Sequence, residues 1–331
     1  MTGSPSSTVR ASSPTVAEVI GARKVYDGLA ALCDVNLAIH AGERLALVGH
    51  NGSGKSTLIK MLLGFVSPDA GQVRVLDRPP DAPDGARMRG RIAYLPERVA
   101  FDPQMTGREV LRFYARLKGA DAQAAALDAL LERVGLRPAA DRRIAGYSKG
   151  MQQRLGLAQA LIGDADIYLF DEPTTGLDPM ARRWFFALVA DLKKRGKAVV
   201  IASHVLTELE RVADRIAMIS NGRLFAVGSL EELRRRAGLP HRLVLTLPQG
   251  MLLRAERAFA GLDAEMTVES DTRLVLTFPP SLKTALLAPL AWLMEEGADI
   301  DFSFSAPGLD ALYAALLEDA EAERNRENGD G

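Results

Sequence analysis

The sequence predicts an α/β fold with a parallel sheet, a helical insert and a second, smaller α+β domain. Short apolar runs such as RLALVG, IYLFDE, AVVIAS and RIAMIS end in polar residues, as buried parallel strands do, and helical stretches separate them. Residues 104–163 replace this alternation with helices alone, and after GSLEELRRRAGLP the composition changes. Because ligands gather at the carboxyl ends of such strands, we expect the functional residues there.

Length and composition limit the number of domains and the functions that the protein can have. The 331 residues suffice for about two domains, and 41 basic against 42 acidic residues argue against a nucleic-acid binder. Cys33 is the single cysteine, which excludes an intrachain disulfide and favours a reducing cytosol. No apolar run reaches the length that spans a bilayer, and the Ser-, Thr- and Pro-rich start lacks the apolar region of a secretion signal.

The pattern of elements divides the chain. We expect a disordered extension over residues 1–16 and a nucleotide-binding domain over 17–238, with a helical insert at about 98–163. Thr106 and Glu109 form a possible capping box at the start of one insert helix. From His241 the pattern reads as strand, helix, strand, helix, strand, helix, which predicts a small accessory α+β domain over 239–320. The charged residues 321–331 are expected to be a disordered tail.

The segment GHNGSGKST carries the strongest signal. It follows the predicted strand RLALV, precedes a predicted helix and satisfies the pattern G-x-x-x-x-G-K-[ST]. Its glycines allow backbone N–H groups to surround a phosphate, the lysine charge reaches the β- and γ-phosphates, and a hydroxyl faces Mg²⁺. The alternative, a glycine-rich surface turn, is disfavoured by the two flanks. The expected ATP-binding residues are Gly49, His50, Asn51, Gly52, Ser53, Gly54, Lys55, Ser56 and Thr57.

The segment DIYLFDEP supplies two acids. Asp171 follows four apolar residues at a predicted strand end, where a carboxylate orients hydrated Mg²⁺. Glu172 comes next and is positioned to accept a proton from an attacking water. By itself this pattern could equally be two solvated acids at a strand end. Together with the phosphate-binding loop, it predicts a nucleoside triphosphatase that uses ATP and Mg²⁺.

Three further motifs narrow the family. YSKGMQQR, DEPTTGLD and SHV occur in this order, and they resemble the signature loop, the D-loop and the switch histidine of ABC-type ATPases. The fold that this resemblance implies is a P-loop NTPase of the ABC ATPase cassette type. Ser148 is a natural N-cap, and in this family the signature loop also closes over the γ-phosphate held by a second copy. The resemblance carries this role to Ser148, Lys149, Gly150 and Met151.

The resemblance also implies roles for single residues. Tyr26 matches the aromatic residue that stacks on adenine, and a core tyrosine is the less favoured alternative. His204 matches the residue that senses the γ-phosphate, and with Lys55 and Glu172 it completes the expected catalytic set. Asp178 matches the D-loop acid that communicates across the dimer.

The sequence departs from the family pattern at two positions. Glu97 in IAYLPER stands where the family usually has glutamine, and we expect its carboxylate to help Ser56 and Asp171 hold Mg²⁺ or to orient water. The signature reads Tyr-Ser-Lys-Gly-Met rather than Leu-Ser-Gly-Gly-Gln, so Lys149 either adds charge near the phosphate or faces solvent. Neither departure removes a catalytic group.

Long segments are similar to a particular subfamily. YLPERVAFDPQMTGREVLRFYARLKGA, AADRRIAGYSKGMQQRLGLAQALIG and SAPGLDALYAALLE resemble the NosF-type ATPase subunits that support maturation of nitrous-oxide reductase in denitrification. This resemblance implies a second copy of the chain, a membrane permease and a periplasmic protein as partners. It also implies copper-site assembly as the task and the cytoplasmic face of the inner membrane as the location. No soft-metal site is evident in one cysteine and four scattered histidines.

Three alternatives stay open at this point. The chain could energise export of another substrate. It could be a soluble ABC-type ATPase acting on ribosomes or DNA, which the single cassette, short insert and balanced charge disfavour. It could also be a regulatory module that binds nucleotide without hydrolysis, which the intact Lys55, Asp171 and Glu172 disfavour.

Overall fold

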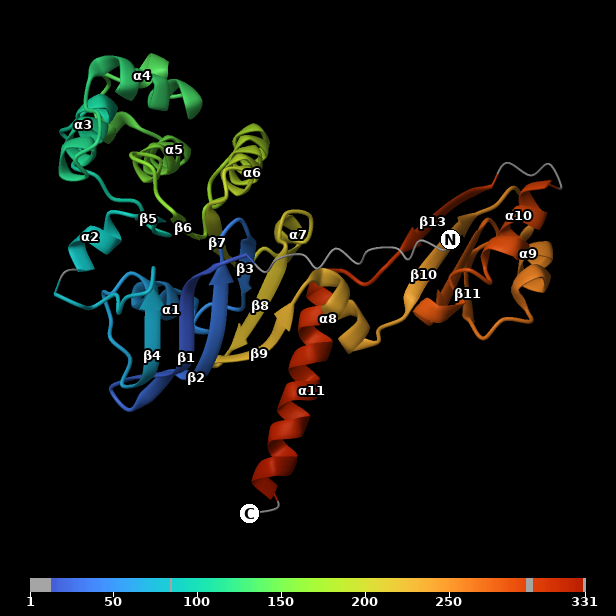
Figure 1. The fold of residues 1–331 in the computed structure, drawn as a ribbon. Coiled ribbons are helices and arrows are strands. Elements are labelled where there is room, and N and C mark those ends of the chain that lie inside the picture. The colour runs from blue at the N-terminus through green and yellow to red at the C-terminus, as the bar shows by residue number, and fades with distance from the viewer. Residues whose placement is uncertain (1–12, 84, 296–299, 330–331) are drawn as a thin grey trace, which may run out of the picture. The chain divides into compact units, whose positions relative to one another are not determined.

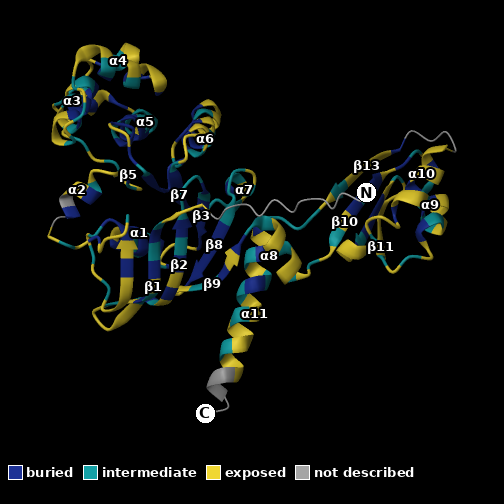
Figure 2. Ribbon diagram, viewed as in Figure 1, coloured by how far each residue is buried: buried dark blue, intermediate teal, exposed yellow. Residues whose placement is uncertain are grey.

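The computed structural model describes residues 13–83, 85–295 and 300–329, and for residues 86 and 327–329 it describes the backbone alone. The chain divides between Ser229 and Leu230 into two compact units. Each unit has its own hydrophobic core, and the two cores are dark blue in Figure 2. We describe the two units in turn, with the element labels of Figure 1.

The first unit is built on a six-stranded sheet with the order β5-β6-β7-β3-β8-β9. Five neighbouring strands run parallel, and β9 pairs antiparallel with β8 at one edge. Nearly every residue of the central strands is buried, because helices and a second sheet cover this sheet. The strands are β3 (Arg44–Val48), β5 (Ile92–Leu95), β6 (Ile167–Asp171), β7 (Ala198–Ser203), β8 (Arg215–Ser220) and β9 (Arg223–Gly228).

A smaller antiparallel sheet with the order β2-β1-β4 completes this core (Figure 1). Its strands are β1 (Thr15–Tyr26), β2 (Leu29–His40) and β4 (Ala70–Val75). Their buried alternate residues share one apolar cluster with the helix α1 (Lys55–Leu62) and with strands of the large sheet. The remaining helices around the large sheet are α2 (Gly85–Arg89), α6 (Pro179–Lys194) and α7 (Leu206–Leu209). The core therefore holds α1, and the phosphate-binding loop before it, in place.

The insert between β5 and β6 contains three α-helices, α3 (Gly107–Leu117), α4 (Ala124–Arg133) and α5 (Lys149–Ala160), and two short 3₁₀ turns, η1 (Arg137–Ala139) and η2 (Ile144–Gly146). Thr106 and Glu109 form the expected capping box at the start of α3. Arg108 forms ion pairs with Asp128 of α4 and with Asp141. These contacts join the start of α3 to the rest of the insert.

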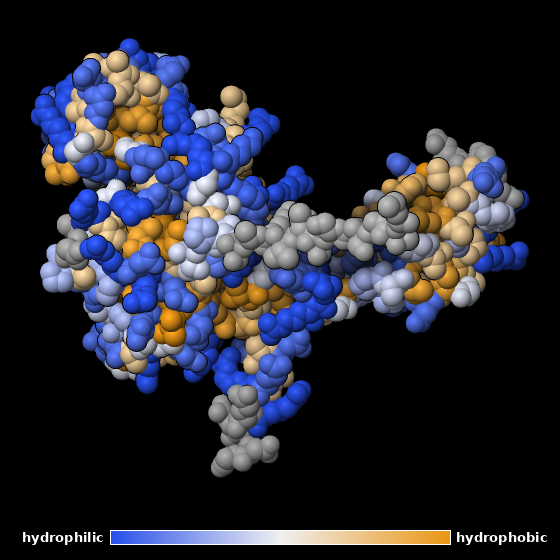
Figure 3. Space-filling model, viewed as in Figure 1, coloured by the Kyte–Doolittle hydropathy of each residue, from blue (hydrophilic) through white to orange (hydrophobic). Residues whose placement is uncertain are grey.

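The second unit is a four-stranded antiparallel sheet with the order β11-β12-β10-β13. Alternate leucines of the two central strands pack against buried residues of the helices, Phe259 of α9 and Leu290 of α10. Some apolar side chains stay exposed, among them Leu253, Leu287 and Trp292, and Figure 3 shows apolar surface on this unit. Its elements are α8 (Leu230–Ala237), β10 (His241–Thr246), α9 (Leu252–Phe259), β11 (Glu265–Ser270), β12 (Arg273–Phe278), η3 (Pro280–Leu282), α10 (Leu287–Glu295), β13 (Asp301–Ser305) and α11 (Leu309–Gly329).

The structure differs from the sequence-based prediction in three places. It divides the chain at residue 229 rather than 238, because α8 packs against α11 of the second unit. It adds β11, whose residues are all exposed and which has only two apolar residues, Met266 and Val268. The segment over 321–331, expected to be disordered, continues α11 as far as Gly329, and its alanine, glutamates and arginines are good helix formers.

The expected disordered extension over residues 1–16 lies mostly outside the described residues, and the end of it, from Thr15, belongs to β1. Residues 330 and 331 also lie outside. Among the residues described, no helix combines the length and the apolar character needed to cross a bilayer.

Candidate active site at the carboxyl ends of four parallel strands

Four neighbouring parallel strands deliver the predicted catalytic residues to one edge of the large sheet. The loop 49–57 follows β3, Asp171 and Glu172 stand at the end of β6, and His204 follows β7. Glu97 comes two residues after the end of β5. Because these strands are adjacent in the order β5-β6-β7-β3, their ends meet although they lie far apart in the sequence.

The phosphate-binding loop needs its glycines for conformation and for space. Gly52 and Gly54 adopt φ angles of 82° and 112°, in the left-handed region that favours glycine. At Gly49, a Cβ atom would lie 2.3 Å from the carbonyl oxygen of Ile219. The side-chain oxygen of Ser53 is buried and has no hydrogen-bond partner among the described residues. A phosphate oxygen would satisfy such a buried donor.

Lys55 and Ser56 connect this loop to Asp171. The Lys55 ammonium donates to the carbonyl oxygens of Gly49 at 2.6 Å and His50 at 3.1 Å. The Ser56 hydroxyl donates to Oδ2 of Asp171 at 3.0 Å. Burial lowers the pKa of Lys55, and the charges of Glu172, Asp171 and Glu97 oppose that shift. The Lys55 ammonium therefore lies near three carboxylates, and two backbone carbonyl oxygens accept its hydrogen bonds.

Burial and the neighbouring carboxylates also change the pKa of Asp171. Burial raises the pKa of Asp171, the charges of Glu172 and Glu97 add to the rise, and Ser56 and Lys55 counteract it. Burial raises the pKa of nearby Tyr94 to about 12, with the charges of Asp171 and Glu97 contributing. The exposed Glu97 therefore acts electrostatically on the same place as Asp171.

Several hydrogen bonds fix the position of Glu172. Its backbone has a φ of 47°, unusual for a residue with a side chain, and its N–H donates to the carbonyl oxygen of Ala202. One carboxylate oxygen accepts from the Ser203 hydroxyl at 3.1 Å. The other accepts from the backbone N–H of His204 at 3.0 Å and lies 2.9 Å from Nδ1 of the same residue. The carboxylate is buried and oriented, whereas the His204 side chain is half exposed.

Lys55, Glu97, Asp171 and Glu172 line a cavity of about 230 Å³, whereas His204 contacts Glu172 and is not among the lining residues. Its lining combines backbone N–H groups, one lysine and three carboxylates, a set of groups suited to a phosphate chain and a hard cation. The lining residues are Ala31, Asn51, Gly52, Ser53, Gly54, Lys55, Ser56, Thr57, Glu97, Asp171 and Glu172.

Other predicted site residues lie outside this cavity. Tyr26 is 41% exposed, with the Lys24 ammonium 5.6 Å from its ring centre. Nδ1 of His50 lies 2.7 Å from the carbonyl oxygen of Asn51, and Gly49 packs against the carbonyl oxygen of Ile219. Asp178 accepts from the backbone N–H of Ala181 and caps α6.

The four signature residues stand at the start of α5. The Ser148 hydroxyl accepts from the backbone N–H of Met151 at 3.3 Å, as an N-cap does. Ser148 and Lys149 are exposed, and Gly150 lies so near the carbonyl oxygen of Gly176 that a Cβ atom would be 2.9 Å from it. Within one copy of the chain, none of these four residues lines the phosphate cavity.

Two polar residues that sequence reasoning missed support the site. Ser203 holds Glu172, and its place directly before His204 at a strand end was the available signal. Gln153 of α5 is buried and donates to the carbonyl oxygen of Pro173, which ties the signature helix to the loop after Glu172. Nothing in the local sequence distinguishes Gln153 from its neighbour Gln152.

Comparison with known proteins supports this architecture. A family model described as ABC transporter matches residues 32–175. The Nod factor export ATP-binding protein I of Bradyrhizobium diazoefficiens is 38% identical over 219 residues, which cover 65% of this chain and 71% of that protein. The ATP-binding cassette sub-family A member 7 of Rattus norvegicus is 34% identical over 308 residues, 89% of this chain and 14% of that protein. This second match is longer than the first unit and so continues into the second.

Solved structures cover the cassette. A structure entitled ATP binding subunit of ABC transporter has a TM-score of 0.63 and 31% identity, and covers 68% of this chain and 94% of its own. The dimeric post-hydrolysis state of the cassette MJ0796 bound to ADP and Pi has a TM-score of 0.61 and 25% identity. The match covers 65% of this chain and 98% of that chain. The predicted fold class is thereby confirmed, and the chain belongs to the ABC transporter family, as an ATP-hydrolysing ATP-binding cassette.

Proposed function

We propose that two copies of this chain bind Mg-ATP between them and hydrolyse it to drive an export permease in the membrane. The observation that carries this proposal is that Lys55, Asp171 and Glu172 line one cavity, with His204 in contact with the Glu172 carboxylate. In this proposal Lys55 and the loop N–H groups hold the β- and γ-phosphates. Glu172 accepts the proton of the attacking water, and His204 stays near the γ-phosphate.

Mg²⁺ fits the oxygen donors present. The Ser56 hydroxyl and the Asp171 carboxylate already lie 3.0 Å apart, and the Glu97 carboxylate faces the same cavity. Hard oxygen ligands of this kind are those that Mg²⁺ prefers. When bound, Mg²⁺ would neutralise charge that develops on the phosphates. Glu97 in place of the usual glutamine adds one negative charge that the cation or Lys55 has to balance.

The signature loop suggests why two copies are needed. Ser148 and Gly150 begin α5 with exposed backbone, and a helix N-terminus favours an anion. Because they lie outside the cavity of their own chain, they are free to close over the γ-phosphate of a partner. The cassette MJ0796 is known as a dimer, which supports this arrangement. Asp178 and Tyr26 receive their proposed roles, at the dimer and at adenine, from the family resemblance.

The insert is the proposed contact with the permease, over residues 97–116. A groove of about 390 Å³ runs beside this segment and is lined by Phe65, Tyr94, Phe101 and Tyr114, among others. Phe65 in this groove and Phe113 and Leu117 on α3 are large apolar side chains that stay exposed. Apolar side chains in and beside a groove suit a helix of a partner protein. The chain would then lie at the cytoplasmic face of the inner membrane through that permease.

The task of the transporter is a separate proposal. Export is favoured by the relatives named Nod factor export ATP-binding protein. The NosF-type role, with copper-site assembly, denitrification and a periplasmic partner, rests on the resemblance of three sequence segments, whereas those relatives carry the Nod factor name instead. Among the described residues, no three or more His, Cys, Asp or Glu side chains are grouped so that they could hold a metal ion without further ligands such as the phosphates. We assign an accessory role, in dimerisation or regulation, to the second unit.

One experiment separates these functions. The chain is purified from detergent-solubilised membranes of its own cell, and phosphate release is measured with and without Mg²⁺. We expect a multi-span membrane protein to co-purify and Mg²⁺-dependent hydrolysis to require Glu172. Co-purifying ribosomes or DNA would support the soluble alternative instead, and a flat phosphate trace with the permease present would support a regulatory module.

A gene deletion distinguishes export from the NosF-type role. If the deletion strain makes nitrous-oxide reductase that lacks copper, the NosF-type role is right. If the enzyme keeps its copper while secreted products change, the chain serves an exporter.

A further inference from the structure

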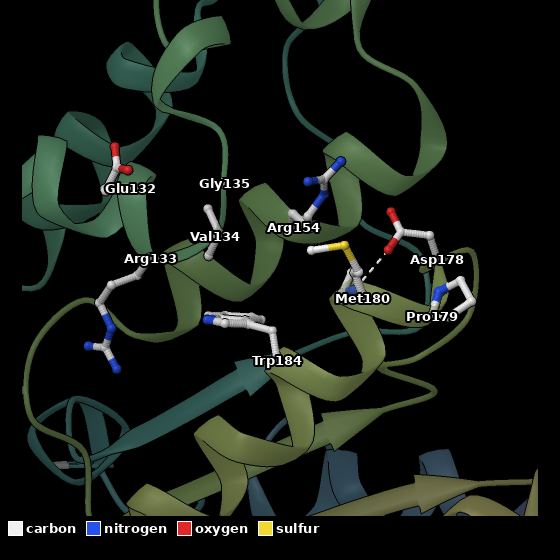
Figure 4. Close-up of a pocket in the computed structure, with 10 residues that line it drawn as sticks. Glu132, Arg133, Val134, Gly135, Arg154, Asp178, Pro179, Met180 and Trp184 are labelled. Atoms are coloured by element: carbon white, nitrogen blue, oxygen red, sulfur yellow. Dashed lines mark hydrogen bonds between the residues drawn. The ribbon is translucent and has the colours of Figure 1, made fainter.

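A second cavity, of about 630 Å³, lies between the helical insert and α6 and shares no lining residue with the phosphate site (Figure 4). The end of α4, the middle of α5 and the first turns of α6 enclose it. It is lined by Glu132, Arg133, Val134, Gly135, Arg154, Asp178, Pro179, Met180, Ala181 and Trp184. A cavity of this size matches those that hold small organic molecules.

Apolar side chains form most of its wall. Figure 4 shows the Trp184 ring beneath the Val134 side chain, with Met180 beside Arg154. Met180 is 74% exposed, and contact of so large an apolar side chain with water is unfavourable in free energy. A flat apolar group would bury Met180 and the face of the indole ring together.

One polar group of the cavity, the Arg154 guanidinium, lacks a hydrogen-bond acceptor at Nε. Nε of Arg154 is buried and has no hydrogen-bond partner among the described residues. A buried donor left without a partner costs free energy, more so when the group is charged. The two acids nearby do not satisfy this donor: Asp178 already caps α6, and the Glu132 carboxylate points away from Trp184 in Figure 4. Arg133 is exposed at the edge and adds positive charge.

We propose that this cavity is a binding site for a small aromatic carboxylate. The ring of the ligand lies against Trp184, Val134 and Met180, and its carboxylate accepts from the Arg154 guanidinium. An arginine fork matches a planar carboxylate with two parallel hydrogen bonds. The site draws one wall from the insert and one from α6, so an occupant bridges these two parts.

The two tryptophans of the chain make the test specific, because one lines the cavity and the other, Trp292, lies in the second unit. The full chain is labelled with 5-fluorotryptophan, and Trp292→Phe assigns the two ¹⁹F resonances. The probes are 2-naphthoate, the neutral 2-naphthamide and the cationic 2-naphthylmethylamine. We expect 2-naphthoate to shift the Trp184 resonance saturably, with a dissociation constant of about 1 mM or tighter, and to leave Trp292 unchanged.

Charge and position are then tested separately. The amide should bind about tenfold more weakly than the carboxylate, since hydrogen bonds to a charged group are the stronger ones. Arg154→Met should abolish that difference. Met180→Glu, at an exposed position where folding is not disturbed, should block 2-naphthoate by repulsion, whereas Leu253→Glu, also exposed and in the second unit, should not.

Three results would overturn the proposal. They are a Trp184 resonance that does not respond to 2-naphthoate, equal binding of the amine and the carboxylate, and unchanged 2-naphthoate binding in Met180→Glu.

Discussion

Replacing Glu172 with glutamine tests the proposed general base with little disturbance of the fold. The glutamine oxygen retains the two contacts with His204, and the Ser203 hydroxyl can turn to accept from the new amide. The volume of the side chain is unchanged. We therefore expect the free energy of unfolding to change by no more than about 1 kcal/mol.

The effect on catalysis should be far larger. A glutamine side chain cannot accept the proton of the attacking water, and a positioned general base contributes roughly 10²–10⁴-fold to rate. That range corresponds to about 3–5 kcal/mol of transition-state stabilisation. Binding of Mg-ATP should persist, because Lys55, Ser56 and the loop N–H groups are intact.

The assay combines single-turnover phosphate release with binding of a fluorescent ATP analogue, on wild type and on Glu172→Gln. Thermal unfolding of both proteins is the control for folding. Hydrolysis by the variant at the wild-type rate would refute the assignment of the base. A variant that neither binds nucleotide nor keeps its unfolding temperature would show that Glu172 is structural instead.

Three further changes have expected outcomes. Gly49→Ala should abolish binding of the ATP analogue, because its Cβ would lie 2.3 Å from the Ile219 carbonyl oxygen; unchanged affinity would contradict the packing described for this loop. Glu97→Gln removes one of three carboxylates at the cavity, so Mg-free ATP should bind several-fold more tightly by the same assay, and weaker binding would show that Glu97 helps hold the nucleotide. Although burial alone would raise the pKa of Asp214, hydrogen bonds from Arg44 and a lysine lower it to about 2. A depressed pKa stabilises the fold above the ordinary value of 3.8 and loses that effect as the pH falls toward 2. Asp214→Asn should therefore cost about 2 kcal/mol at pH 7 in denaturant unfolding and almost nothing at pH 2, and a gap independent of pH would contradict this.

Local patterns made the cassette predictable from the sequence. The loop 49–57 is specified by nine consecutive residues with a strand before and a helix after, so its geometry depends little on distant parts of the chain. Parallel strands that end in functional residues bring their ends together through the rules of sheet topology, and these rules are enough to predict that Asp171 lies near Lys55.

Contacts between residues far apart in the chain could not be predicted from the sequence. The hydrogen bond of Ser203 to Glu172 joins the ends of two different strands, and although the place of Ser203 before His204 marks it as a site residue, that place does not reveal its partner. The strand β11 has only two apolar residues, Met266 and Val268, at alternate positions, and this pattern is too short to distinguish a strand without its pairing with β12. The cavity beside Trp184 lies between the end of α4, α5 and the start of α6, and it depends on how the insert packs on the core.

The arrangement of two copies around ATP is the central claim, and a structure of Glu172→Gln with Mg-ATP tests it most directly. The account predicts a symmetric pair in which the Ser148 hydroxyl of one copy lies within hydrogen-bond distance of the γ-phosphate held by Lys55 of the other. A nucleotide-filled pair in which Ser148 stays remote from both γ-phosphates would contradict it.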